Sequence, residues 1–193
     1  MSPPEPQKVA IVTGADRGIG AGVSAAFRRD GYAVVGTSRS IGASDEPDFL
    51  TVRGDIAEAD TSRRVVEQAL DRFGRIDSLV NDAGIYIEKP FTEYTFEDYA
   101  AITAVNLTGF FHMTQRVIRQ MAGQGGGHVN AVSLGVIRTP INDPASDERM
   151  AALHPLGRMG EISDVVDGIL YLERATFVTG EVLHIDGGQV AGH

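Results

Sequence analysis

Short apolar runs alternate with longer amphipathic stretches along most of the chain. Two of the runs, 9–12 and 33–37, are rich in β-branched residues and contain no charged residue, which is typical of strands buried on both faces of a parallel sheet. Between them, apolar positions recur at helical spacing from Gly18 to Gly31. This succession predicts a first strand–helix–strand unit with parallel strands.

The remainder of the chain continues the alternation. Strands that alternate with helices predict an α/β fold: a Rossmann-type, doubly wound parallel sheet with helices on both faces. We expect the Pro-rich residues 1–7 to form a flexible tail and residues 8–193 to form a single dinucleotide-binding domain. The further strands are predicted at 49–52, 76–80, 128–133 and 182–185, and the further helices at 62–73, 96–121 and 162–172.

The composition excludes several classes of partner. Acidic residues outnumber basic residues by 26 to 17, and the net charge of −9 disfavours binding to nucleic acid or to anionic membranes. The chain has no cysteine, no apolar run long enough to span a membrane, and no histidines at metal-ligand spacing. We therefore expect a soluble, cytoplasmic protein that contains neither disulfides nor a metal site.

A glycine-rich turn joins the first strand to the first helix. It reads Thr-Gly-Ala-Asp-Arg-Gly-Ile-Gly from Thr13 to Gly20. Glycines at this position let the chain turn tightly and bring backbone N–H groups close to a pyrophosphate at the start of the helix. Taken alone, the pattern is also compatible with a purely structural turn between a strand and a helix.

Further motifs follow the glycine turn along the chain. They are Asp55, Asn-Asp-Ala-Gly at 81–84, Asn106, and the segments 135–140, 155–161 and 179–188. In this order the motifs resemble the short-chain dehydrogenase/reductase family, in particular its 3-oxoacyl-(acyl carrier protein) reductases. The resemblance implies a Rossmann fold, a nicotinamide cofactor, a small carbonyl or secondary alcohol substrate, and a homo-oligomer, either a dimer or a tetramer.

The end of the second strand indicates which cofactor is bound. NAD-binding members of the family carry an acid here, which bonds the ribose hydroxyls and repels a 2′-phosphate. This chain carries Ser38, followed by Arg39, and Arg17 lies in the glycine turn. Two guanidinium groups are suited to bind a 2′-phosphate. We therefore expect NADP(H), the alternative being that both arginines are solvated surface charges.

The resemblance also assigns roles to individual residues. It implies that Asp55 and Ile56 hold the adenine, that Asn81, Ala83 and Gly84 line the adenosine ribose, and that Ile137 and Thr139 fix the nicotinamide end. Two positions, Asp82 and Leu134, depart from the family pattern, which has Asn and Pro there. The expected cofactor-binding residues are Gly14, Asp16, Arg17, Gly18, Ile19, Gly20, Ser38, Arg39, Asp55, Ile56, Asn81, Ala83, Gly84, Ile137 and Thr139.

The catalytic set that the family implies is incomplete. It consists of a Tyr, a Lys four residues later, a Ser and an Asn, and only the Asn has a counterpart here, Asn106. None of the five tyrosines precedes a Lys at that spacing. Residues 126–129 resemble the start of the family's fifth strand, whereas residues 130–133 resemble the end of its sixth. We therefore expect one strand and one helix fewer than in the family, a loss of about 30 residues or more.

Several alternatives stay open at this point. The missing segment is either deleted from the protein or omitted from the sequence, and the continuous numbering favours a deletion. Asn106 either retains its catalytic role or only bonds helix backbone, and Tyr86 is the one phenol available as a substitute acid. The chain is accordingly an NADP-dependent oxidoreductase with doubtful catalysis, a non-catalytic NADP(H)-binding protein or partner subunit, or a degenerate product that barely folds.

Overall fold

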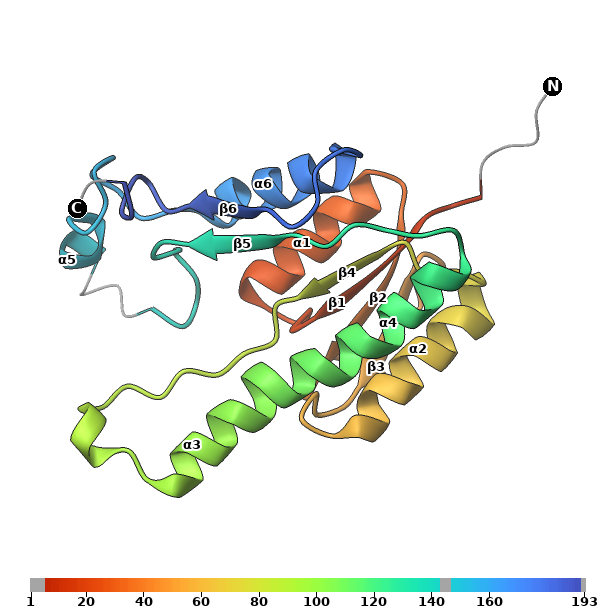
Figure 1. Ribbon diagram of the computed structural model, residues 1–193, viewed down its shortest axis with the longest axis horizontal. Helices are drawn as coiled ribbons and strands as arrows, with labels where there is room; N and C mark the ends of the chain where they lie inside the picture. Colours follow the sequence, from red (N-terminus) through yellow and green to blue (C-terminus); the bar gives the residue numbers. More distant parts are fainter. Residues whose placement is uncertain (1–5, 143–146, 192–193) are drawn as a thin grey trace. The chain divides into compact units, whose positions relative to one another are not determined.

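The computed structural model describes residues 6–142 and 147–191 (Figure 1). Most of the expected flexible tail therefore lies outside the described residues. The chain forms two compact units: the first contains Met1–Asp16 and Phe27–Gly127, and the second contains Arg17–Ala26 and His128–His193. The single-domain expectation stays a prediction.

A four-stranded parallel sheet forms the centre of the first unit. Its strands are β1 (Val9–Thr13), β2 (Ala33–Ser38), β3 (Phe49–Arg53) and β4 (Ser78–Asn81), in the order β3-β2-β1-β4. All five residues of β1 are buried, as expected for a central strand between two parallel neighbours. Because the strands are parallel, their carboxyl ends meet at one edge of the sheet, where α/β proteins bind ligands.

Two helices of the first unit, α2 (Ala59–Phe73) and α4 (Phe110–Gly123), pack side by side against the sheet. Both are amphipathic, and each places its apolar stripe in the core. The core side chains that they share with the sheet are Ile11, Val35, Val65, Ala69, Met113 and Val117.

A long helical region leads into α4. It begins as α3 (Phe96–Thr103) after a short 3₁₀ turn at Phe91–Glu93, and a wider π-helical segment, Ala104–Gly109, joins α3 to α4. A capping box starts α3, in which Thr95 Oγ1 accepts from the Asp98 N–H at 3.2 Å and Asp98 Oδ2 accepts from the Thr95 N–H at 2.8 Å. π-helical turns are rare in proteins, and those that do occur often lie at functional sites.

The second unit contains a two-stranded parallel sheet of β5 (Ala131–Leu134) and β6 (Val182–Ile185). Helix α6 (Ile162–Arg174) packs against both strands, and a short helix, α5 (Asp147–Ala151), lies between β5 and α6 in the chain. Helix α1 (Gly18–Arg29) begins in this unit. A Cβ on Gly22 would lie 2.3 Å from Ile162 Cγ2, so only glycine permits this close approach of α1 to α6.

The parallel α/β class that the sequence predicts is confirmed. The strands form two hydrogen-bonded sheets instead of one, because no described strand pairs with the outer edge of β4 or with the second edge of β5. The strand expected at 76–80 begins at Ser78, because a side chain and not a strand bonds the backbone of Ile76. None of the described helices has the length and apolar character of a membrane-spanning segment.

Candidate functional site

The first half of the glycine turn is fixed by backbone contacts within the first unit. Gly14 has a φ of 70°, and a Cβ at this position would lie 3.1 Å from the backbone N of Ala83. The N–H groups of Gly14 and Ala15 both donate to the carbonyl of Thr37, at 2.8 and 3.3 Å. These two donors therefore hold the turn to β2, and the expected contact of the turn with a pyrophosphate stays a prediction for its other N–H groups.

The second half of the turn keeps its donors. In α1 the first intrahelical bond runs from the Ala21 N–H to the carbonyl of Arg17, at 3.2 Å. Among the described residues, the N–H groups of Gly18, Ile19 and Gly20 donate to no backbone carbonyl. They stand at the start of a helix, where the first N–H groups have no intrahelical partner and the helix dipole favours an anion.

A buried hydroxyl positions the loop that follows β4. Thr13 is 1 % exposed, and its Oγ1 accepts from the N–H groups of Asp82 and Ala83, both at 3.0 Å. The amide of Asn81 donates to Thr114 Oγ1 on α4 at 3.0 Å. The loop that carries the expected ribose-lining residues Asn81, Ala83 and Gly84 is thereby held at the carboxyl ends of β1 and β4.

The expected phosphate-selecting residues lie at the end of β2, in a network of polar bonds. Ser38 Oγ accepts from the Ser40 N–H at 3.2 Å, and Ser40 Oγ donates to Asp16 Oδ2 at 2.5 Å. Arg53 Nε donates to the carbonyl of Arg39 at 2.8 Å, so a second guanidinium lies beside Arg39.

Arg53 is a residue of this corner that the sequence does not predict. The signal for it is the register of the sheet, in which the last residue of β3, Arg53, pairs with the last residue of β2, Ser38. That register becomes visible only once the two strands are known to be neighbours. Arg39 and Arg53 are both exposed, so this corner of the first unit carries two guanidinium groups.

The residues expected to hold the adenine follow β3. Asp55 Oδ1 accepts from the Ala57 N–H at 3.0 Å, which closes a turn before α2. The side chain of Ile56 is 7 % exposed and belongs to the hydrophobic core. Ile56 can therefore offer a ligand its backbone groups far more readily than its side chain.

Asn106, in the π-helical segment, binds the loop after β4. Its Oδ1 accepts from the Ile85 N–H at 2.9 Å, and its Nδ2 donates to the Ile85 carbonyl at 3.0 Å. The alternative that Asn106 bonds helix backbone is wrong, because its partner belongs to a loop. Both polar atoms of the amide are engaged with one residue, which fixes the path of the chain just after Gly84.

The tyrosines and lysines near this loop form no acid–base pair. Tyr86 is 75 % exposed, and Lys89, three residues later, forms an ion pair with Asp98 and lies 5.5 Å from the centre of the Tyr94 ring. That ion pair lowers the pKa of the Asp98 carboxyl. The hydroxyl of Tyr94 donates to the carbonyl of Ile87. Lys89 is thus engaged elsewhere and is not positioned to activate Tyr86.

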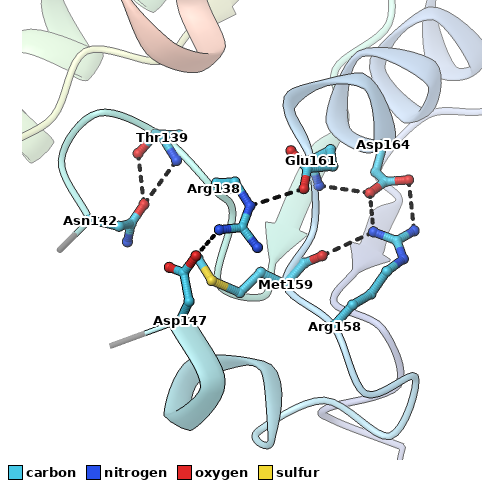
Figure 2. Close-up of polar contacts among 8 residues, drawn as sticks. All are labelled: Arg138, Thr139, Asn142, Asp147, Arg158, Met159, Glu161 and Asp164. Atoms are coloured by element: carbon cyan, nitrogen blue, oxygen red, sulfur yellow. Dashed lines mark hydrogen bonds and ion pairs between the residues drawn. The ribbon is translucent and has the colours of Figure 1, made fainter. Parts of the chain in front are cut away.

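In the second unit, the segment after β5 carries the expected nicotinamide-binding residues. Ile137 forms a parallel bridge with Gly160, and the Arg138 N–H donates to the Gly160 carbonyl at 2.8 Å. The next residue, Thr139, donates from its backbone N–H and its hydroxyl to Asn142 Oδ1, both at 3.0 Å (Figure 2). A Cβ on Gly18 would lie 3.9 Å from Thr139 Cγ2, so this segment borders the start of α1.

Ion pairs anchor this segment to the start of α6 (Figure 2). Arg138 Nε lies 3.1 Å from Glu161 Oε1, and the same guanidinium pairs with Asp147 at the start of α5. Arg158 binds both oxygens of Asp164, at 2.7 and 3.1 Å. The hydrogen bond from Arg158 and a second one from the Glu161 N–H lower the pKa of Asp164 to about 2.

The comparison with known proteins agrees with this architecture. The model of the short chain dehydrogenase family matches residues 8–145, and that of the Enoyl-(Acyl carrier protein) reductase family matches residues 123–189. The chain belongs to the short-chain dehydrogenase family.

Similar proteins include reductases from bacteria and mammals. The 3-oxoacyl-[acyl-carrier-protein] reductase FabG of Thermotoga maritima is 30% identical over 240 residues, which cover 95% of this chain and 98% of that protein. L-xylulose reductase of Bos taurus is 31% identical over 238 residues, covering 94% of this chain and 96% of the relative. The structure of ElxO with NADP bound has a TM-score of 0.89 at 23% identity and covers 96% of this chain and 99% of that chain, which shows the shared fold.

The alignments also show that this chain is shorter within its matched region. The alignment with the Thermotoga maritima reductase has 240 positions, whereas the whole chain has 193 residues, so the chain must leave gaps against that relative. The two proteins nevertheless match almost from end to end. This length difference is compatible with an internal deletion of the size that the sequence predicts.

Proposed function

We propose that the chain binds NADP(H) and is an oxidoreductase of carbonyl or secondary alcohol substrates whose turnover is slow in the absence of a Tyr–Lys pair. The observation that carries the choice of cofactor is the end of β2, where Ser38 stands in place of an acid and the guanidinium of Arg53 is bonded to the backbone of Arg39. Two cations, with a serine in place of the acid at the last residue of β2, favour the 2′-phosphate of NADP(H) over the bare ribose of NAD(H).

Groups suited to a dinucleotide occur in each unit taken by itself. In the first unit, Ser38, Arg39 and Arg53 suit the adenosine 2′-phosphate. In the second unit, the N–H groups at the start of α1 suit the pyrophosphate, and Thr139 suits the nicotinamide end. The role of Arg17 in phosphate binding stays a prediction, and so do a cytoplasmic location and a homo-oligomeric state.

The expected rate follows from the missing acid. Bound NADPH would supply a hydride to a carbonyl carbon, and the alkoxide that forms must take a proton. Loss of a positioned acid typically costs about 10²- to 10⁴-fold in rate. Water is left to provide the proton in this chain, because Tyr86 has no activating lysine.

A second candidate function is non-catalytic binding of NADP(H), as a sensor or as a partner of an intact relative. The state of Asn106 favours it, because each polar atom of this amide makes a hydrogen bond to the Ile85 backbone. In that role the side chain stabilises a loop and is not required to contact a substrate.

Two measurements test these proposals. Thermal melts with millimolar NADPH or NADH should show a larger upward shift with NADPH, since a ligand that binds only the folded state stabilises it. Arg39→Gln and Arg53→Gln should each reduce the NADPH shift, whereas Arg29→Gln, which removes an exposed charge from the end of α1, is the matched control. The absence of any shift with wild-type protein would refute NADP(H) binding.

The second measurement separates the two candidates. NADPH oxidation is followed against a panel of ketones and 3-oxoacyl thioesters, with a no-protein control. A slow rate above the control supports the oxidoreductase, and a rate equal to the control together with a clear NADPH melting shift supports the non-catalytic protein.

A further inference from the structure

The segment that carries Thr139 closes into a tight turn with the sequence Thr-Pro-Ile-Asn. The N–H of Asn142 donates to the carbonyl of Thr139 at 3.1 Å, and Pro140 occupies the second position, where a fixed φ favours a turn. The side chain of Asn142 reaches back across the turn to Thr139 (Figure 2). Both residues are half-buried, so the contact is partly shielded from water.

The contact determines which atom of the Asn142 amide faces Thr139. The backbone N–H of Thr139 points at the Asn142 side chain over 3.0 Å. A backbone N–H can only donate, so the atom that faces it must be the carbonyl oxygen and not the NH₂ group. The assignment therefore follows from the hydrogen-bond chemistry and does not depend on distinguishing O from N by shape.

The same oxygen fixes the direction of the Thr139 hydroxyl. Asn142 Oδ1 lies 3.0 Å from Thr139 Oγ1, and a carbonyl oxygen has no proton to give. The hydroxyl must therefore donate its single proton to Asn142. Towards any further partner, Thr139 Oγ1 presents lone pairs only, and it can act only as an acceptor.

We propose that Asn142 is a positioning residue that makes Thr139 select a nicotinamide cofactor by the NH₂ group of its carboxamide. The proposal rests on the proposed NADP(H) binding and adds a determinant of specificity to it. A freely rotating hydroxyl would accept from the NH₂ group or donate to the carbonyl of a carboxamide equally well. A hydroxyl held by Asn142 meets only the NH₂ group, and an analogue without that group would place oxygen lone pairs or a methyl group against Oγ1.

The position of the turn agrees with this role. A Cβ on Gly18, at the start of α1, would lie 3.9 Å from both Cβ and Cγ2 of Thr139. The start of α1 carries the N–H groups suited to a pyrophosphate, and the ring that Thr139 would contact is attached to the ribose on one side of that pyrophosphate. Asn142 itself needs no contact with the cofactor, because it acts through the hydroxyl of Thr139.

The test compares three ligands by isothermal titration. They are NADPH, its reduced 3-acetylpyridine analogue, in which a methyl group replaces the NH₂ group, and ADP-ribose 2′-phosphate, which lacks the ring. For wild-type protein we expect NADPH to bind about tenfold more tightly than the acetyl analogue. This is the effect on affinity of losing one hydrogen bond and leaving its acceptor, Thr139 Oγ1, without a donor. In Asn142→Ala this ratio should fall to about two, because the hydroxyl can then rotate.

Two further variants control for the fold of the turn. Asn142→Asp keeps an acceptor oxygen facing Thr139 and should retain most of the tenfold ratio. Thr139→Val removes the hydroxyl and should bring the ratio close to one. Binding of ADP-ribose 2′-phosphate should change little in all three variants, which shows that each is folded.

The outcomes separate this proposal from the proposed function. A wild-type ratio near one, or an unchanged ratio in Asn142→Ala or in Thr139→Val, overturns the role of Asn142 while NADP(H) binding stands. If Asn142→Ala no longer binds ADP-ribose 2′-phosphate, that variant is misfolded, and the ratios measured for Thr139→Val and Asn142→Asp decide instead. Wild-type protein that binds neither NADPH nor ADP-ribose 2′-phosphate refutes the proposed function itself, and this proposal with it.

Discussion

Gln124 holds Ile76 by both of its backbone groups. Gln124 Oε1 accepts from the Ile76 N–H at 3.2 Å, and Nε2 donates to the Ile76 carbonyl at 2.9 Å. Ile76 is fully buried and lies two residues before β4, whose outer edge pairs with no described strand. The amide side chain at the end of α4 thus makes the two hydrogen bonds that a neighbouring strand would otherwise make.

Substitution of Gln124 should therefore destabilise the first unit. Gln124→Ala should lower the free energy of unfolding by about 1–2 kcal/mol, because it leaves two backbone groups near the core without a partner. Gln120→Ala is the matched control, since Gln120 is half-buried on the same helix and its amide bonds Gln124 and not the backbone of Ile76. Urea denaturation measures both, and hydrogen exchange at the Ile76 amide should accelerate only in Gln124→Ala. Equal losses in the two variants would contradict the role given to Gln124.

The glycine at the start of the phosphate-binding turn should be intolerant of a side chain. Gly14→Ala forces a φ of 70° on alanine and places a Cβ 3.1 Å from the Ala83 backbone, so we expect a loss of about 2 kcal/mol. Gly42 is exposed and a Cβ there would meet no atom within 4 Å, so Gly42→Ala should stay within about 0.5 kcal/mol of wild type. Urea melts compare the two variants, and a Gly14→Ala protein as stable as Gly42→Ala would show that the turn can relax.

Stability in acid should depend on Asp164. Its folded pKa is about 2, below the ordinary value of 3.8, because Arg158 and the Glu161 N–H bond the carboxylate. A group with a lowered folded pKa contributes stability above its unfolded pKa and loses it as the pH falls. The advantage of wild type over Asp164→Asn should therefore be full above about pH 4 and vanish towards about pH 2.

The size of this advantage is limited by solvent. The side chains of Arg158 and Asp164 are 53% and 33% exposed, so we expect no more than about 1 kcal/mol from the pair. Urea midpoints between pH 6 and pH 2.5 measure it. Asp167→Asn, on the exposed face of α6, controls for the loss of one negative charge. A difference between wild type and Asp164→Asn that does not change with pH would rule out the carboxylate as its source.

The junction between the fifth and sixth family strands is open to a direct chemical test. Trypsin cleaves after Arg119 and after Arg138, so a true deletion yields one peptide, 120–138, that contains His128, Val129 and Asn130 in succession. We expect mass spectrometry to detect this peptide, and the intact chain to have a mass near 20.6 kDa. Its absence, with larger peptides that begin at Gln120 in its place, would show that residues were omitted and would restore the possibility of a complete catalytic set.

Most of the sheet could be predicted from local sequence. The strands β1, β2, β3 and β6 lie within one residue of their predicted bounds, because apolar runs between turn residues determine buried parallel strands. The strand predicted at 128–133 is observed as β5, which starts three residues later and ends one residue later. Asn130 instead bonds the Val178 carbonyl and the Glu181 N–H through its side chain, and the ladder starts at Ala131.

The site could be predicted only in part, because its remaining residues act through tertiary neighbours. Arg53 joins the phosphate-selecting corner through the register between β2 and β3, and no local pattern reveals that register. Asn142 faces Thr139 only because the turn at Pro140 closes. The π-helical segment around Asn106 has no local signal either, since its residues fit an ordinary helix equally well.

Two side-chain amides, those of Gln124 and Asn106, hydrogen-bond the backbone before and after β4. These bonds make the length of one stretch of chain depend on the length of another. Gln124 binds Ile76 before β4, and Asn106 binds Ile85 after it. At about 3.3 Å per residue the extended stretch from Ile76 to Ile85 spans about 30 Å, and at about 1.5 Å per residue the helical stretch from Asn106 to Gln124 spans about 27 Å. An insertion or deletion in either stretch alone would break the hydrogen bonds of Gln124 to Ile76 or those of Asn106 to Ile85. In evolution, length changes are therefore expected to accumulate outside these two stretches, and the predicted junction near Val129 lies outside both.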